Sequence, residues 1–432
     1  MQGASSGVSQ QQLVPLKQND TMLSKVKKHC FVHPNEPITI AQLIKPLYII
    51  LSVFGLFPYS VKFQSKKGLT IIKKSIYLNS LCAVSHILFL TSFLAVHIRY
   101  VYDSLGDTAM TREVLTQMNY ILELIAFQLF CFTAYFCAFT NRSTYVKIIN
   151  KITKFLEPPN MKMDKEVKRC RYQVNIILVF LVTVFILQIC VNFSRDSSFW
   201  KTILVCISFL LPQMIQFTVI AFYYVLVLML IVLLTNVKMH IVNLVKNDIK
   251  IMDYFVKAES KITTLQYVES LYSKAFEIKR EINEAFQAPL LITTLQCFHA
   301  IVSEAHIIYH GLVVERDFSL HSIFNCSIWI IYQSIKIYII SRSGSLLKRE
   351  VKRIGQALHD IPTEKHDIRL LLEVTIQHFT SLMAYQGDDM TAYGLVNFDA
   401  ALLSKVRRGI NSQLHLPVFL YWFQNPNSLK SY

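Results

Sequence analysis

Seven long apolar stretches separated by polar segments dominate the chain. They lie at about 76–100, 117–140, 174–194, 202–235, 287–314, 318–341 and 395–423. Each has at least about 20 residues, which at ~1.5 Å per residue is enough to cross a hydrocarbon core of ~30 Å. The pattern therefore predicts an all-α fold: a polytopic membrane protein with seven transmembrane helices.

Lysine and arginine gather on alternate connections between these stretches. The connection 141–173 is strongly basic, and so are the segment before residue 76 and the block 342–353. The remaining short connections, near 101–116, 195–201 and 315–317, are almost balanced in charge. Because basic loops stay in the cytoplasm, the pattern predicts a cytoplasmic N-terminus and, after seven crossings, an extracellular C-terminus. This orientation is opposite to that of a G-protein-coupled receptor.

Composition supports a membrane protein over a soluble one. Apolar residues make up 53% of the chain and charged residues only 17%, against roughly 25% in soluble domains. The net charge of +16 would suggest a nucleic-acid partner in a soluble protein. Here the positive excess follows the alternation of the loops, so the predicted partner is the lipid bilayer and no nucleic acid is expected.

A shorter apolar run precedes the seven spans, at 43–61. It is interrupted by Pro46, Gly55 and Pro58 and is flanked by basic residues on both sides. We interpret it as an interfacial or re-entrant helix, with an eighth crossing as the alternative. The residues before it are polar, lack a secretory signal and predict a flexible leader.

Two connections are long enough to fold on the cytoplasmic side. In both, apolar residues recur at helical spacing among alternating charges, which predicts helices whose apolar stripes pack between subunits below the membrane; solvated linker helices are the alternative. The predicted organisation is a cytoplasmic leader (1–42), an interfacial helix and basic linker (43–75), spans one and two (76–140), a basic loop (141–173), spans three and four (174–240), a helical loop (241–286), spans five and six (287–341), a second helical loop (342–390), span seven (391–423) and a tail (424–432).

Polar residues inside the predicted spans are the candidates for function. Charged side chains are costly in a bilayer, so Glu123 and Glu304 are expected to face protein or water. Such groups either hold helices together by hydrogen bonds or contact a ligand beside aromatic walls, and the pattern leaves both readings open. The candidate ligand-binding residues are Glu123, Gln213, Gln216, Glu304, His306, Asn325 and Trp329.

The chain shows no pattern of catalytic or metal-binding residues. His306 and His310 are one helical turn apart, but the HExxH order of a zinc helix is absent. There is no glycine-rich phosphate loop and no nucleophile elbow. The sequence therefore predicts no enzyme, no metal and no cofactor.

The segment before the last span carries a family resemblance. Thr391-Ala392-Tyr393-Gly394 is followed by Phe398-Asp399 and the pair Leu402-Leu403. Together with the spacing of spans and loops, this segment resembles the insect gustatory receptor family. The resemblance implies a ligand-gated, non-selective cation channel in the plasma membrane of sensory dendrites. It further implies a homo- or hetero-tetramer of related receptors, with a pore lined by the seventh helices and a sugar or bitter tastant bound in each subunit.

The end of the chain departs from that family. Lys405, Arg407 and Arg408 fall within the predicted seventh span, and each costs roughly 2.5 to 3.5 kcal/mol at a bilayer centre. Gly409 and Pro417 weaken the helix further. We hypothesise that this tail impairs conduction. Codons for Lys405-Val406-Arg407 can contain a splice donor, so 406–432 is either the genuine end of the span or translated intron.

Two other classes share a multi-span pattern. A secondary transporter would show internal repeats and helices broken by Gly or Pro in matching halves. The chain shows no such repeat and contains only 11 Gly. A G-protein-coupled receptor would need an external N-terminus. These remain the alternatives to a tastant-gated channel.

Overall fold

The computed structural model describes residues 40–57, 60–64, 68–72, 76–103, 114–156, 163–193, 199–246, 254–315, 319–361, 368–406 and 408. All of them belong to one compact unit, 38–432. Its elements are α2 (Ile40–Val53), β1 (Ser60–Gln64), β2 (Gly68–Ile72), α3 (Ile76–Asp103), α4 (Val114–Thr140), α5 (Arg142–Leu156), α6 (Met163–Phe193), α7 (Phe199–Val205), the π-helical turn η2 (Cys206–Leu210), α8 (Leu211–Lys246), α9 (Tyr254–Tyr309), the π-helical turn η4 (His310–Glu315), α10 (Leu320–His359), α11 (Ile368–Gln386), β3 (Thr391–Ala392) and β4 (Val396–Asn397). A short helix at 400–406 ends the described chain.

The membrane-spanning pattern is confirmed for the described part of the chain. Six of its helices are long and apolar enough to cross a bilayer, with windows at Ala83–Tyr100, Met118–Thr140, Glu166–Leu187, Thr202–Val245, Ser260–Leu312 and Leu320–His359. The protein is therefore an all-α, multi-pass membrane protein. About half of the predicted seventh span (391–423), residue 407 and residues 409–423, lies outside the described residues, as do the tail and residues 1–39 of the predicted leader. Residues 40–42 of that leader, predicted to be flexible, form the first turn of α2.

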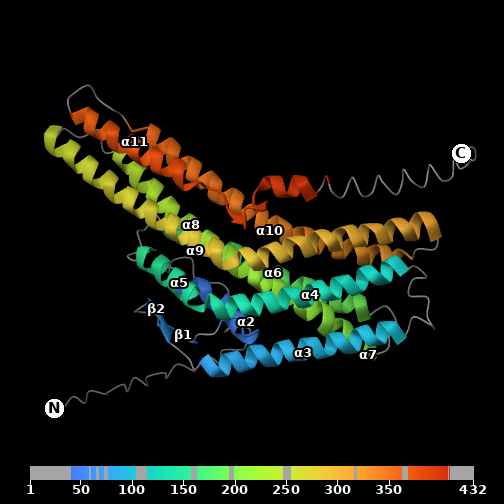
Figure 1. Ribbon diagram of the computed structural model, residues 1–432. Helices are drawn as coiled ribbons and strands as arrows, with labels where there is room; N and C mark the ends of the chain where they lie inside the picture. Colours follow the sequence, from blue (N-terminus) through green and yellow to red (C-terminus); the bar gives the residue numbers. More distant parts are fainter. Residues whose placement is uncertain are drawn as a thin grey trace, which may run out of the picture. The chain divides into compact units, whose positions relative to one another are not determined.

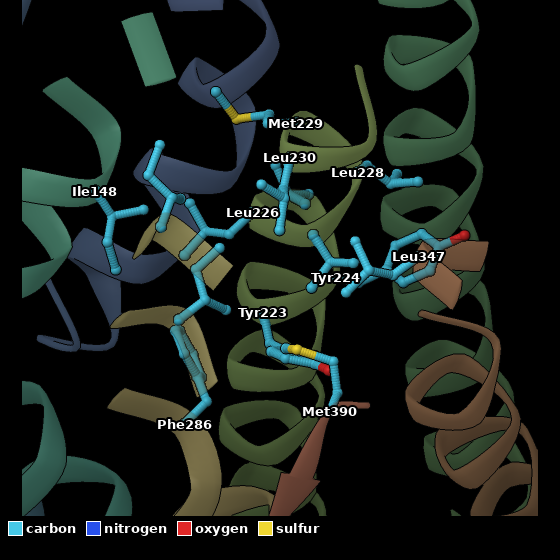
Figure 2. Packing of buried hydrophobic residues seen from close by; sticks show 14 of the residues in the cluster. Ile148, Tyr223, Tyr224, Leu226, Leu228, Met229, Leu230, Phe286, Leu347 and Met390 are labelled. Atoms are coloured by element: carbon cyan, nitrogen blue, oxygen red, sulfur yellow. The ribbon is translucent and has the colours of Figure 1, made fainter. Parts of the chain in front are cut away.

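Helix α8 lies at the centre of the bundle. In its most apolar stretch of 18 residues, 94% of the residues are buried, compared with 11% in the corresponding stretch of α3. Its sequence is apolar on every side, which is typical of a helix surrounded by protein. Figure 2 shows the result around Tyr223, where Ile148 of α5 lies on one side of α8 and Leu347 of α10 on the other. By contrast, α3 exposes large apolar side chains on the surface that lipid would cover, among them Leu81, Val84, Leu88, Phe89 and Val96.

Helix α9 is far longer than a membrane is thick. Its 56 residues span about 84 Å, so only part of it fits a ~30 Å core. The sequence predicted a helical loop at 241–286 and a separate span from 287, but one helix runs through that boundary. Pro289 lies inside it, and Figure 1 shows α9 changing direction near its middle. A proline that lacks a backbone donor accounts for such a bend.

The apolar run at 43–61 begins as α2 and is too short to span. At 14 residues, α2 is about 21 Å long. Leu43, Leu47 and Leu51 recur at helical spacing and are buried, and α2 packs against α8. The chain then forms an antiparallel hairpin in which Ser60 of β1 pairs with Ile72 of β2. The sequence predicted only helices, so this hairpin and the one formed by β3 and β4 were not expected.

Ion pairs join the basic segment after α4 to helix α9. Lys151 of α5 lies 2.8 Å from a carboxylate oxygen of Glu277 and 2.8 Å from one of Glu281, and Lys147 is 2.6 Å from Glu281. Burial opposes the charge of Lys151, but its hydrogen bonds to Glu277 and Glu281 outweigh that effect and raise its pKa above the ordinary value. The network fixes α5 along the polar half of α9.

Helix α11 packs on the same polar half of α9. The rings of Tyr272 and Phe379 are 5.3 Å apart between centroids, and Nδ1 of His378 is 2.9 Å from a carboxylate oxygen of Glu269. Figure 1 shows the two helices side by side. On the opposite face of α11, the side chains of Leu370, Leu371 and Val374 are exposed.

Candidate functional site

A fully buried lysine marks the interior of the helix bundle. Lys336 of α10 has no exposed surface, and its Nζ donates hydrogen bonds to the Oε1 atoms of Gln213 and of Gln216, the latter at 2.5 Å. The ammonium group also lies 4.6 Å from the ring centroid of Tyr332. Carbonyl acceptors and an aromatic face offset part of the cost of burying a cation.

Helical spacing brings these side chains together. Gln213 and Gln216 are three residues apart on α8, so they share one face of that helix. Trp329, Gln333 and Lys336 follow one another at intervals of four and three residues on α10. Both faces are buried, because α8 and α10 pack directly against each other.

A second polar contact links helix α4 to the same face of α10. The indole Nε1 of Trp329 donates to Oε1 of Glu123 at 3.1 Å, and both side chains are buried. Phe209 packs edge-on against the Trp329 ring at 6.1 Å between centroids. Glu304 lies close enough to repel Glu123 electrostatically, while Lys336 attracts it. Glu123 therefore belongs to one electrostatic cluster with Lys336.

Helix α9 completes this buried cluster through neutral groups. The Nε2 of Gln216 donates to Oε1 of Gln296 at 3.2 Å, and Sγ of Cys297 donates to Oε1 of Gln333 at 3.3 Å. Because Lys336 requires the carbonyl oxygens of Gln213 and Gln216 to face it, their amide nitrogens point elsewhere. In the described part of the chain, the Nε2 atoms of Gln213, Gln296 and Gln333 have no acceptor.

The sequence-predicted residues are only partly brought together. The cluster contains Glu123, Gln213, Gln216 and Trp329, and the charge of Glu304 acts on it. His306 lies near the end of α9, where its ring is 6.0 Å from that of His310. Asn325 is half-buried one turn before Trp329. Within the described residues, no group of three His, Cys, Asp or Glu side chains could hold a metal ion.

Sequence reasoning missed the central member, Lys336. A single cation inside the apolar span 318–341 was visible, and an ionisable residue at membrane depth is by itself a signal of function. It also missed Gln296, Cys297 and Gln333, as well as Thr293, whose Oγ1 accepts a hydrogen bond from Nε2 of Gln216 at 3.4 Å. Those four neutral residues carry no comparable signal, because only the packing of three helices places their polar atoms together.

The segment that carries the family resemblance folds into the β3–β4 hairpin and docks on the bundle. Tyr393 and Gly394 form its turn with φ of 51° and 70°, a region that glycine adopts without strain. Phe398 is buried against Tyr223 of α8, with 6.5 Å between ring centroids. The approach to α10 is so close that a Cβ on Gly344 would lie 1.7 Å from the carbonyl oxygen of Phe398.

Hydrogen bonds hold both ends of this hairpin. The backbone N–H of Thr391 donates to Oδ1 of Asn283 on α9 at 3.0 Å, and Oγ of Ser341 on α10 donates to the carbonyl of Asp399 at 2.5 Å. Oδ1 of Asp399 accepts from the N–H of Ala401 at 2.9 Å, which caps the helix at 400–406. Leu402 in that helix is buried and Leu403 partly buried. The motif thus ties the start of the last helix to α9 and α10.

Comparison with solved structures finds the same fold in insect olfactory receptors. The olfactory receptor OR5 from Machilis hrabei in complex with eugenol superimposes with a TM-score of 0.65 at 11% sequence identity, covering 87% of this chain and 97% of that one. A second structure of the same olfactory receptor gives a TM-score of 0.64 at the same identity and coverage. At this identity the likeness concerns the fold. A search of curated proteins found no match.

The sequence also matches a family model over most of its length. The model describes the 7tm chemosensory receptors, and the match covers residues 44–413. It therefore extends from α2 through the docked hairpin and beyond the last described residue. This is a family of receptors, not of enzymes. The chain belongs to the 7tm chemosensory receptor family.

Proposed function

We propose that this receptor is a gustatory receptor: a subunit of a tastant-gated, non-selective cation channel in the dendritic membrane of sensory neurons. Family membership supports chemoreception, and the resemblance of the segment 391–403 to gustatory receptors supports taste over smell. The similar OR5 structure holds eugenol, so this fold accommodates a small organic ligand in at least one receptor.

The observation that carries this proposal is the polar cluster around Lys336. It lies inside the apolar bundle, where a cation and three unpaired amide donors are costly unless they serve binding. Gln213, Gln296 and Gln333 offer N–H groups to a ligand with acceptor oxygens, and Trp329 with Tyr332 supply aromatic walls. A sugar or an oxygen-rich bitter compound has this chemistry. Glu304, His306 and Asn325 would contact parts of the ligand that extend beyond the cluster.

The proposed assembly is a tetramer of this chain or of this chain with related receptors. The exposed Leu370, Leu371 and Val374 on α11 support subunit packing below the membrane, because an apolar stripe of this kind is stabilised by a protein partner. The proposed sidedness places α5, α11 and the polar half of α9 in the cytoplasm, in agreement with the basic charge of 141–173.

The direct test is ligand-evoked current. The receptor would be expressed alone and with related receptors, then exposed to sugars, bitter compounds and volatile odorants including eugenol. We expect cation currents evoked by a soluble tastant and unchanged by G-protein inhibition. Responses to volatile compounds alone would reassign the receptor to olfaction. A response abolished by G-protein inhibition would favour a G-protein-coupled receptor, and substrate accumulation without channel current would favour a transporter.

A further inference from the structure

A small cavity lies between helices α6, α8 and α10, away from the cluster around Lys336. Its volume is about 110 Å³, roughly the space of three or four water molecules in the liquid. Its apolar wall consists of Leu228, Ile231, Val232 and Leu346. Most of the remaining lining residues are polar, and they come from all three helices. Figure 1 shows these three helices lying together in the bundle.

The polar lining of this cavity is strongly basic. Five cations and two carboxylates surround it, which leaves an excess of three positive charges. The cations come from all three helices: Arg169 from α6, Lys238 from α8, and Arg342, Arg349 and Arg353 from α10. Like charges gathered around one cavity repel each other, so the arrangement is stabilised by an anion.

One of the carboxylates is already neutralised within the protein. Glu350 is buried, accepts a hydrogen bond from Lys238 and lies 3.1 Å from Arg353. The negative charge of Glu350 therefore does not compensate the positive charges of Arg169, Arg342 and Arg349. Among the described residues, none forms an ion pair with Arg169 or Arg349, and both side chains are exposed at the cavity. These two guanidinium groups are available to an incoming ligand.

The level of the cavity along the helices indicates the source of that anion. Arg169 lies in the basic loop 141–173, and Arg342 to Arg353 form the basic block after the sixth span. Under the proposed sidedness, both meet the inner leaflet, whose anionic phospholipids attract clustered arginines. The apolar wall of the cavity suits an acyl chain, and a guanidinium fork suits a phosphate.

We propose that this cavity binds the phosphate of an anionic phospholipid headgroup, with Arg169 and Arg349 as its principal contacts and the acyl chains along the apolar wall. This inference rests on the sidedness of the proposed function, but not on conduction. Bound lipid would bridge α6 to α10, because the two arginines come from these two helices.

The test measures lipid binding to the purified full chain in detergent. The protein would be titrated separately with a phosphatidylinositol phosphate that has short acyl chains, with phosphatidylcholine and with a water-soluble inositol phosphate. Native mass spectrometry would measure how much of each compound is bound. The variant is Arg169→Gln with Arg349→Gln, and the matched control is Lys274→Gln with Arg280→Gln, which removes the same charge from a different cavity on α9. We expect the variant to bind the anionic lipid roughly 30-fold more weakly and the control to bind it unchanged.

Each outcome decides the proposal. Equal binding of the anionic lipid by the wild type and the Gln variant would overturn it, and so would binding of phosphatidylcholine as tight as that of the anionic lipid. If the soluble inositol phosphate binds as tightly as the lipid, the source is a free phosphate and the membrane assignment is wrong. The double variant Arg169→Lys with Arg349→Lys keeps the charge and guards against misfolding; it should bind several-fold more weakly than the wild type. Current recordings do not enter this test, so a failed channel proposal would leave its result intact.

Discussion

The backbone of Gly344 on α10 lies so close to Phe398, which follows the β3–β4 hairpin, that there is no room for a side chain at position 344. A Cβ there would lie 1.7 Å from the Phe398 carbonyl oxygen, and that oxygen belongs to the backbone. The neighbouring Ser341 donates to the carbonyl of Asp399, so one face of α10 holds two successive residues of the segment. The entrance to the last helix is thus fixed to α10.

Replacing Gly344 with alanine should therefore destabilise the receptor. The added methyl group would displace either α10 or the hairpin, and overpacking of this kind costs about 1–3 kcal/mol. We expect a lower melting temperature of the detergent-solubilised protein and less receptor at the cell surface. The melting temperature would be measured by fluorescence-detected size-exclusion chromatography.

Gly355→Ala on the same helix is the matched control. Its new Cβ would meet only the Cε of Met383 at 3.7 Å, an ordinary contact, and alanine favours the helix by roughly 0.8–1 kcal/mol over glycine. This variant should be as stable as the wild type or more so. If both alanine variants melt at the same temperature, the close approach of α10 and the hairpin does not determine stability.

Replacing Lys336 with methionine should weaken the response to ligand. The change removes the cation that orients the amides of Gln213 and Gln216, and hydrogen bonds to a charged group are worth about 1.5–3 kcal/mol. We expect the half-maximal tastant concentration to rise at least tenfold in dose–response recordings, after correction for surface expression. Lys348→Met is the control, since Lys348 lies on the same helix and pairs with Asp389 at 3.0 Å in an exposed position. Identical dose–response curves for the two variants would remove Lys336 from the ligand site.

The ion pairs between α5 and α9 should contribute measurably to stability. A double-mutant cycle of Lys151→Met and Glu281→Gln should give a coupling free energy of unfolding of about 1 kcal/mol, because both side chains are mostly buried. The comparison pair is Arg280 and Glu284, which is 3.8 Å apart and 73% and 63% exposed. That pair should couple by less than about 0.5 kcal/mol. Equal coupling in both cycles would mean that burial does not strengthen the α5–α9 network.

The sequence predicts the spans of this fold well but the extent of its helices poorly. Hydropathy marks where a helix meets lipid, and it changes near residue 287, yet α9 begins at Tyr254. The polar half of α9 is stabilised by α5 and α11, through contacts that pair residues more than 100 positions apart, such as Lys151 and Glu281. No local pattern along the chain contains that information.

The candidate site was predictable where a polar or aromatic side chain stood out inside a predicted span, as with Gln213, Gln216 and Trp329. Glu123 was recognised because a carboxylate is costly in a span, and the same argument applied to Lys336 would have found the centre of the cluster. Gln296 and Cys297 resemble ordinary helix-packing residues in sequence. They join the site because α9 packs against α8 and α10 at this level, which is a property of the tertiary structure.

The proposed sidedness predicts which cysteine reporters can be reached from outside the cell. Ser143→Cys lies at an exposed position of α5, in the loop predicted to be cytoplasmic, and Asp107→Cys lies in the connection predicted to be external. A membrane-impermeant maleimide should label the Asp107→Cys variant in intact cells and the Ser143→Cys variant only after permeabilisation. Labelling of the wild type, which has nine cysteines, gives the background. Labelling of Ser143→Cys in intact cells would reverse the topology.

The basic tail predicts weak conduction by this form of the receptor. The helix after the hairpin is described to Val406, and within it Lys405 is exposed. Continuing that helix across the membrane would carry Lys405, Arg407 and Arg408 toward the bilayer, at roughly 2.5 to 3.5 kcal/mol for each centrally placed cation. A variant in which an apolar helix replaces 404–424 should therefore give larger tastant-evoked currents at equal surface expression. Equal, robust currents from both forms would show that the tail does not impair the channel. Sequencing the mature transcript would then decide between the two origins of 406–432, because a continuous message in sensory neurons excludes a retained intron.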